Sequence, residues 1–271
     1  MNNRYSDISN TMKIAEIAAA IESFAPLGLQ ESYDNSGLIV GRPDDEVKCA
    51  LLAVDVTDEV MDEAEREGCD IVITHHPIIF HALKRLNSAD MTQRCVERAI
   101  RRGIAIYACH TNLDAAPGGM SFRLAGMLGA GGLEVLQPAG DTGAGFGAVG
   151  ELPAEMPVAE FMERIRQVTG ARALRHSDIA RQDVRRVAVC TGAGAFLIAE
   201  AVRAGADIYV TSDLKYNDFT AADGRLTVVD AGHFESEYCA IEILFDILSK
   251  NLRNFAVRKS LCSRNPVHYF V

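Results

Sequence analysis

The stretch Asp70-Ile71-Val72-Ile73-Thr74-His75-His76-Pro77 has the pattern of a short buried strand that ends in two adjacent histidines. Its β-branched apolar residues favour a strand, and Pro77 ends that strand because proline cannot donate a hydrogen bond to a neighbour. In open α/β sheets the functional groups lie beyond the carboxyl ends of the strands, which is where these imidazoles would be. His75 and His76 are therefore candidate metal ligands, while an adjacent histidine pair is also compatible with two ordinary half-buried residues.

The composition is that of a globular protein with a substantial core. The chain has 271 residues, of which 48% are hydrophobic, and its formal net charge is -10. This charge argues against nucleic-acid or anionic membrane binding, which needs clustered lysine and arginine. No run approaches the roughly 18 apolar residues of a membrane span, and the polar start at residues 2–7 has no apolar signal core. Seven cysteines without C-x-x-C spacing indicate reduced thiols, so we expect a soluble, cytoplasmic protein.

A second copy of the opening pattern lies 137 positions further along the chain. Residues 63–74 and 200–211 align without a gap, and seven of the twelve positions are identical. The buried strand expected at 50–54 falls on 187–191 at the same offset. The sequence therefore predicts an internal duplication, with two pseudo-symmetric α/β halves at residues 1–138 and 148–271. The glycine-rich residues 139–147 would connect the halves.

Each half also places a histidine and a carboxylate after a buried strand. Three residues separate His110 from Asp114, and three separate His233 from Glu237. One such pair is a weak signal, because an acid near a helix start also interacts with the helix dipole. Two pairs at equivalent strand ends, together with the histidine pair, predict a metal site in the cleft between the halves. The side chains expected to line this cleft are His75, His76, His110, Asp114, His233, Glu235 and Glu237.

The donor atoms of this set favour two divalent metal ions. Imidazole nitrogen and carboxylate oxygen suit zinc, iron or manganese, whereas the absence of thiolates argues against a structural zinc site. A carboxylate can bridge two ions, which together activate water or clamp a displacement. The number of donors fits two metals better than one.

Four motifs resemble those of the Nif-three-like family, whose members are known as GTP cyclohydrolase I type 2 homologues. They are Tyr33-Asp34-Asn35-Ser36-Gly37-Leu38, Thr74-His75-His76-Pro77, His110-Thr111-Asn112-Leu113-Asp114 and Gly232-His233-Phe234-Glu235-Ser236-Glu237. The resemblance implies a duplicated α/β fold, a dinuclear metal centre and a ring-shaped homohexamer built from dimers. It implies as ligands His75, His76, Asp114, His233 and Glu237, of which Glu237 would bridge the ions. His110 and Glu235 would orient ligands or handle protons.

The chain departs from the family pattern at two places. Longer relatives carry an extra domain between the halves, where this chain has only residues 140–150. After Thr211-Ser212-Asp213-Leu214-Lys215-Tyr216, relatives often have histidine, and this chain has Asn217. Neither departure touches the five implied ligands.

Other segments are open to more than one interpretation. Asp34 and Asn35 either form a turn or reach the metals. Cys109, beside His110, is either a core residue or a further ligand or nucleophile. Residues 235–252 predict one long helix, and residues 255–257 and 267–270 predict late strands.

These features lead to two hypotheses for function. The first is a dinuclear metal-dependent hydrolase that uses metal-activated water on a small molecule, and the family name implies GTP or another nucleotide. The second is a non-catalytic metal-binding scaffold or metal-handling interaction protein. Nucleic acid threaded through a ring is disfavoured by the net charge of -10.

Overall fold

The computed structural model describes residues 11–270, so the expectation for the polar start lies outside the described residues. The chain forms two compact units. Unit 1 contains the chain up to Ser23, Asn35–Cys109 and Leu244–Ser263, and unit 2 contains Phe24–Asp34, His110–Ile243 and the chain from Arg264. The units interleave along the sequence, and the continuous halves at 1–138 and 148–271 stay a prediction.

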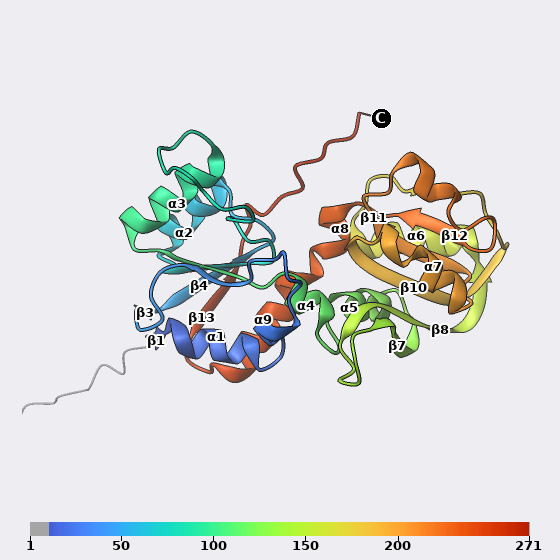
Figure 1. Cartoon of the computed structure of the whole chain (residues 1–271), viewed down its shortest axis with the longest axis horizontal. Helices are drawn as coiled ribbons and strands as arrows, with labels where there is room; N and C mark the ends of the chain where they lie inside the picture. The colour runs from blue at the N-terminus through green and yellow to red at the C-terminus, as the bar shows by residue number, and fades with distance from the viewer. Residues whose placement is uncertain (1–10, 271) are drawn as a thin grey trace, which may run out of the picture. The chain divides into compact units, whose positions relative to one another are not determined.

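Unit 1 is a five-stranded sheet with helices on both faces (Figure 1). Its strands, in spatial order, are β13 (Ala256–Lys259), β4 (Cys49–Ala53), β5 (Ile71–Thr74), β6 (Ala105–Ala108) and β2 (Gly37–Val40). All are parallel except β2. Helices α2 (Asp58–Glu67) and α3 (Met91–Arg102) cover one face, and α1 (Ile14–Glu22) covers the other. The short strands β1 (Met12–Lys13) and β3 (Glu46–Val47) pair separately.

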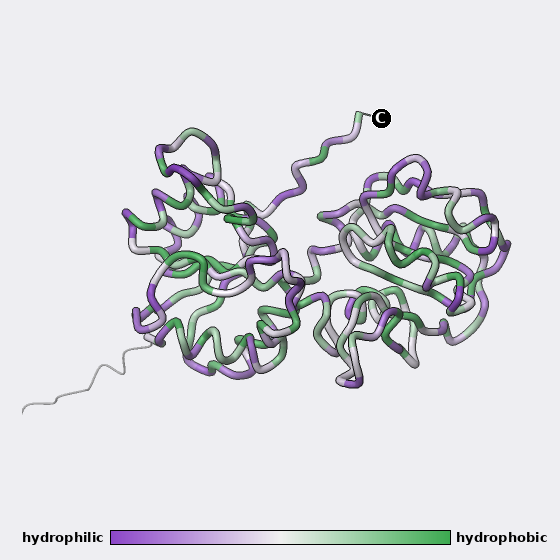
Figure 2. The backbone as a smooth tube through the Cα atoms, viewed as in Figure 1, coloured by the Kyte–Doolittle hydropathy of each residue, from purple (hydrophilic) through white to green (hydrophobic). Residues whose placement is uncertain are grey.

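The helices of unit 1 begin and end where the sequence supplies caps. The Thr57 side chain accepts a hydrogen bond from the Val60 N–H at the start of α2, and Asp90 caps α3 in the same way. Both helices end at a glycine in the left-handed conformation, Gly68 and Gly103. Central strand β4 is buried along its whole length, and Figure 2 shows apolar residues concentrated on the central strands.

Unit 2 is a six-stranded mixed sheet, also covered on both faces. Its strands, in spatial order, are β7 (Gly131–Pro138), β8 (Gly145–Pro157), β10 (Asp183–Ala193), β11 (Ile208–Ser212), β12 (Thr227–Asp230) and β9 (Arg175–His176). Helices α5 (Met120–Met127) and α6 (Val158–Thr169) pack on one face, and α7 (Ile198–Arg203) packs on the other. Short helices α4 (Thr111–Ala115) and α8 (His233–Glu237) follow β6 and β12, and α9 (Cys239–Asn251) follows α8.

The two sheets share a strand order and a register. The run β4-β5-β6-β2 in unit 1 corresponds to β10-β11-β12-β9 in unit 2. Ala50 pairs with Ile71 and Val187 pairs with Ile208, so each partner is displaced by the offset of 137 seen in the sequence. A duplicated unit would produce this correspondence, and the duplication itself stays a prediction.

Three predicted elements differ from the structure. Within the predicted connector at 139–147, residues 139–144 form the turn of a hairpin and residues 145–147 belong to β8, which pairs with β7 up to Pro138 and Gly145. The predicted helix at 235–252 is divided at Tyr238 into α8 and α9. Residues 267–270 form no strand, although they carry the apolar pattern of one.

Glu63 on α2 is a buried carboxylate that holds the segment after β13. It accepts hydrogen bonds from the Ser260 hydroxyl and from the backbone N–H groups of Leu261 and Cys262, the last two at 2.9 and 3.1 Å. Burial raises the pKa of Glu63, but these hydrogen bonds outweigh burial and lower the pKa overall. The charged carboxylate is therefore part of the folded state.

We expect Glu63→Gln to lower the free energy of unfolding by about 1–3 kcal/mol, because one carboxylate acceptor is lost in a buried site. Since the folded pKa lies below the unfolded value of about 4.3, the contribution is present at neutral pH and is lost as the pH falls below about 4. Urea unfolding at pH 7 and pH 3.5 measures both effects. Glu67→Gln is the control, because Glu67 pairs with arginines at the surface. Equal effects of the two substitutions at pH 7 would contradict this role of Glu63.

Candidate metal centre

The histidine pair of unit 1 is fixed by hydrogen bonds to neighbouring elements. The His76 N–H donates to the Val54 carbonyl at 3.0 Å, which holds the chain beside β4. His75 is fully buried, and its Nδ1–H donates to the Cys109 carbonyl at 2.9 Å. The Nδ1–H of His76 donates to Asp55 Oδ1 at 2.7 Å. In both rings Nε2 is thereby the nitrogen that can act as a metal ligand.

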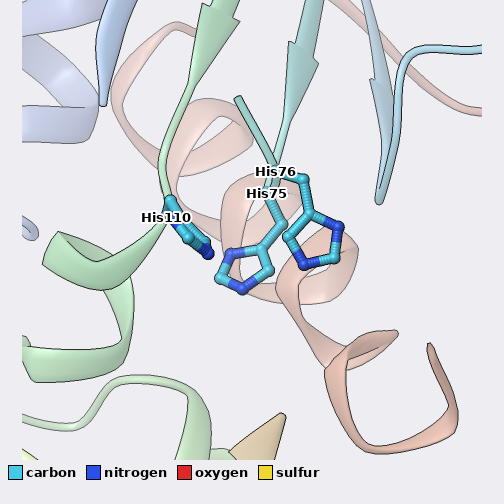
Figure 3. Close-up of side chains that lie close together, drawn as sticks. All are labelled: His75, His76 and His110. Atoms are coloured by element: carbon cyan, nitrogen blue, oxygen red, sulfur yellow. The ribbon is translucent and has the colours of Figure 1, made fainter. Parts of the chain in front are cut away.

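His110 follows Cys109 directly, at the end of strand β6. Because β5 and β6 are parallel neighbours, the residues that follow them lie side by side. One ring nitrogen from each of His75, His76 and His110 lies within 4.8 Å of the others (Figure 3). This spacing is close enough for the three rings to hold an ion.

Unit 2 places two histidine–carboxylate pairs around one cavity of about 480 Å³. His110 and Asp114 come from the start of α4, and His233 and Glu237 come from α8. A spacing of four residues puts both members of a pair on one face of a helix. The Thr191 hydroxyl donates to Asp114 Oδ1 at 3.3 Å, which fixes that carboxylate.

The two histidines of the cavity are oriented in the same way as the pair in unit 1. The Nδ1–H of His110 donates to Asp34 Oδ1 at 2.7 Å, and the Asp34 side chain is fully buried. The Nδ1–H of His233 donates to Asp213 Oδ2 at 2.8 Å. Asp213 has a φ of 56°, a backbone conformation that is uncommon outside glycine. Asp34, left open between a turn and the site, thus orients a site histidine, whereas Asn35 donates to the Ile79 carbonyl.

His233 and Glu237 form a close pair, with Nε2 and Oε2 separated by 2.9 Å. Burial lowers the pKa of His233, but hydrogen bonds and charge interactions with Glu237 and Asp213 outweigh it and raise the pKa to about 9. The protonated imidazole thus compensates the buried Glu237 carboxylate. A metal ion would replace this proton, because only the neutral ring is a ligand.

Gly192, at the end of β10, makes room for Glu237. A Cβ atom at this position would lie 2.1 Å from Glu237 Oε1, and the residue has a φ of 64°. Gly192 also donates its N–H to the Ser236 hydroxyl at 3.0 Å. Any larger residue here would displace the carboxylate.

Glu235 does not line this cavity, although it was expected beside His233 and Glu237. It lines a separate cavity of about 400 Å³, where Oε1 accepts a hydrogen bond from Asn265 Nδ2 at 2.7 Å. Two residues along a helix correspond to a rotation of about 200°, so Glu235 points away from the face that its neighbours share. The helical period explains its position.

These features define a mixed α/β protein with histidine and carboxylate groups that could bind a metal ion. A family model described as Duf34/NIF3 (NGG1p interacting factor 3) matches residues 12–266. The chain therefore belongs to the Duf34/NIF3 family, and the predicted family is confirmed. Within residues 11–270, no helix has both the length and the apolar character needed to cross a bilayer.

Three similar proteins match over most of their own length. A Clostridium perfringens protein named GTP cyclohydrolase 1 type 2 homolog is 33% identical over 229 residues, which are 84% of this chain and 87% of that protein. The crystal structure of a Staphylococcus aureus hypothetical protein has 26% identity and a TM-score of 0.88, covering 96% of this chain and 99% of that one. The structure of a Bacillus cereus protein related to NIF3 has 25% identity, a TM-score of 0.87 and the same coverage.

We expect Gly192→Ala to weaken binding of Mn²⁺ at least about tenfold, because the new methyl group displaces the Glu237 carboxylate from the cavity. Isothermal titration calorimetry measures the affinity, and circular dichroism monitors the fold. Gly224→Ala is a matched control, because Gly224 has a φ of 68° and nothing within 4 Å of the added atom. It shares the backbone cost of about 1–2 kcal/mol without the clash. Equal Mn²⁺ affinities for the two variants would contradict the role of Gly192.

Proposed function

We propose that this protein is a dinuclear metal-dependent hydrolase of a small molecule. The proposed ligands are His75, His76, Asp114, His233 and Glu237, with Glu237 as the bridge. One observation carries the proposal: His75, His76, His110 and His233 each donate from Nδ1 to a protein oxygen. Core histidines need no common arrangement of this kind, whereas metal-binding histidines are held in this way by carboxylates and carbonyls.

The donor chemistry limits which ions fit. Imidazole nitrogen and carboxylate oxygen suit zinc, iron or manganese. The buried thiol of Cys190 lines the cavity, and burial raises its pKa to about 12, so it does not compete as a thiolate at neutral pH. Divalent ions bound here would supply Lewis-acid activation of water.

His110 is the residue that we propose to move protons. Because Asp34 accepts a hydrogen bond from Nδ1–H of His110, Nε2 is the nitrogen that remains available to exchange a proton. The Asp34 carboxylate thereby holds the ring in one orientation. The Thr111 N–H donates to Asp34 Oδ2 at 3.0 Å, which holds the carboxylate in place.

A nucleotide is the substrate class suggested by the name of the Clostridium perfringens relative, GTP cyclohydrolase 1 type 2 homolog. Hydrolytic opening of the guanine ring needs activated water and a proton donor, which the proposed site would supply. Assembly into a homohexamer is part of the same proposal and rests on the family resemblance.

We expect Glu237→Gln to lower the affinity for Mn²⁺ at least about tenfold and to abolish hydrolysis, because it removes a charged ligand. Glu235→Gln is the matched control, because this carboxylate lies two residues away in a different cavity. It should retain the bound metal. Metal content after dialysis, measured by mass spectrometry, distinguishes the two variants, and equal retention would contradict the ligand assignment.

The reaction itself is tested by offering GTP to protein loaded with manganese, iron or zinc. We expect a ring-opened product, and a rate lowered by about 10²–10⁴-fold in His110→Ala with metal content retained. The absence of turnover with all three metals would contradict the cyclohydrolase proposal. Cellular function that survives both Glu237→Gln and His110→Ala would contradict catalysis as the cellular role.

A further inference from the structure

The cavity of unit 2 extends well beyond its histidines and carboxylates. Its volume of about 480 Å³ is in the range of small-molecule sites, and two ions would fill only a small part of it. Besides the histidines and carboxylates, the lining includes Glu31, Tyr33, Gln137, Phe146 and Phe196, which we call the outer part of the cavity. These side chains have no role in the proposed metal centre. Their chemical character therefore indicates which kind of organic ligand the cavity can bind.

Aromatic side chains form one wall of the outer part. The rings of Phe146 and Phe196 pack edge to face, with centroids 6.1 Å apart and an interplanar angle of 79°. Phe196 is nevertheless 55% exposed and Tyr33 is 64% exposed, so both present ring surface to solvent. Exposed aromatic rings that line a cavity are typical of sites that stack a flat ligand.

The position of Phe196 depends on a tight turn after β10. Phe196 lies on the 3-10 helix η2 (Ala195–Leu197), which Gly194 precedes. A Cβ atom at Gly194 would lie 2.3 Å from Thr211 Oγ1 and 2.6 Å from the Tyr209 hydroxyl. Glycine thus lets the turn pack against β11 and carry the ring to the cavity.

Polar groups beside the aromatic rings suit the edge of a nitrogen heterocycle. Gln137 pairs directly with Phe146 across the hairpin, so the amide and the ring share one face of the sheet. The amide can both donate and accept, and the Glu31 carboxylate accepts from ring N–H or amino groups. Burial and the neighbouring carboxylates raise the pKa of Tyr33, which keeps its hydroxyl protonated as a donor.

The same lining does not suit a phosphate. Among residues 11–270, no lysine or arginine lines the cavity, while Glu31, Asp114 and Glu237 add negative charge. Carboxylates repel a phosphate group, and phosphate recognition by side chains normally uses arginine or lysine.

From this combination we propose that the outer cavity, formed by Glu31, Tyr33, Gln137, Phe146 and Phe196, binds a planar N–H-bearing nitrogen heterocycle and makes no contribution to phosphate recognition. The inference deepens the proposed function by assigning the recognised part of the substrate. The heterocycle would stack on Phe196, with its N–H edge toward Glu31.

The test measures binding to metal-free protein, so it does not depend on hydrolysis. The probes are guanosine, adenosine, cytidine, uridine, GTP and inorganic triphosphate, and their dissociation constants are obtained by ligand-observed NMR titration. We expect at least one nucleoside to bind, inorganic triphosphate not to bind, and GTP to bind no more than about threefold more tightly than guanosine. Binding of triphosphate, or failure of every nucleoside to bind, would overturn the inference.

Substitutions at the cavity identify the contacts. Phe196→Ala should weaken binding of the best nucleoside at least about tenfold through loss of stacking, and Glu31→Gln should weaken it to a similar extent. Tyr216→Ala, which removes an aromatic ring that is 88% exposed and lies outside the cavity lining, should have no effect. Because the chain has no tryptophan, Phe196→Trp gives a single indole whose fluorescence should change on binding. Unchanged affinity in Phe196→Ala would also overturn the inference.

The outcomes separate this inference from the proposed function. Nucleoside binding without turnover of GTP under any of the three metals would leave the inference standing and reject the cyclohydrolase proposal. Turnover and normal metal content without nucleoside binding would reject the inference and leave the proposed function standing. Metal content of Phe196→Ala should equal that of the wild type, because Phe196 is not a proposed ligand.

Discussion

The candidate site depends on one repeated interaction, the hydrogen bond from histidine Nδ1 to a protein oxygen. Asp55, Asp34 and Asp213 accept it from His76, His110 and His233, and the Cys109 carbonyl accepts it from His75. Each bond fixes the tautomer and the ring orientation, and thus selects Nε2 as the reactive nitrogen. Without these acceptors the rings could rotate, and the donor atoms would not be held for a metal.

Residues at equivalent positions of the two sheets have different roles in orienting the site side chains. Asp55 follows β4 and orients His76, whereas Gly192, displaced by 137 residues, makes space for Glu237. His76 in turn corresponds to Asp213, which orients His233. At this equivalent position one sheet supplies a proposed ligand, His76, and the other supplies Asp213, which orients the proposed ligand His233. The carboxyl ends of the parallel strands are where open α/β sheets place such groups.

Much of the fold and of the donor set could be predicted from the sequence. Strand β5, helices α2 and α3 and their glycine ends follow from short apolar runs and caps, which are local signals. The family was predicted from four motifs, and the match to the Duf34/NIF3 family model confirms it. The repeated pattern of a histidine, three residues and a carboxylate singled out His110, Asp114, His233 and Glu237, which all line one cavity.

Other features depend on contacts that no local pattern contains. The glycine-rich residues 139–147 have the composition of a connector, and only the pairing between β7 and β8 identifies a hairpin there. The supports Asp55 and Gly192 follow strands but lie far in sequence from the side chains they serve. The position of Glu235 was available from the helical period, which places it opposite His233 and Glu237. The aromatic wall joins Tyr33, Phe146 and Phe196 from three distant segments.

The most direct test of the central claim is anomalous X-ray scattering from crystals of the metal-loaded protein, recorded on both sides of the metal absorption edge. The account predicts two anomalous peaks per chain, with Nε2 of His75, His76 and His233 and the carboxylates of Asp114 and Glu237 as ligands. It also predicts that Nδ1 of each histidine keeps its oxygen partner. Peaks elsewhere on the chain, or coordination through Nδ1, would contradict it.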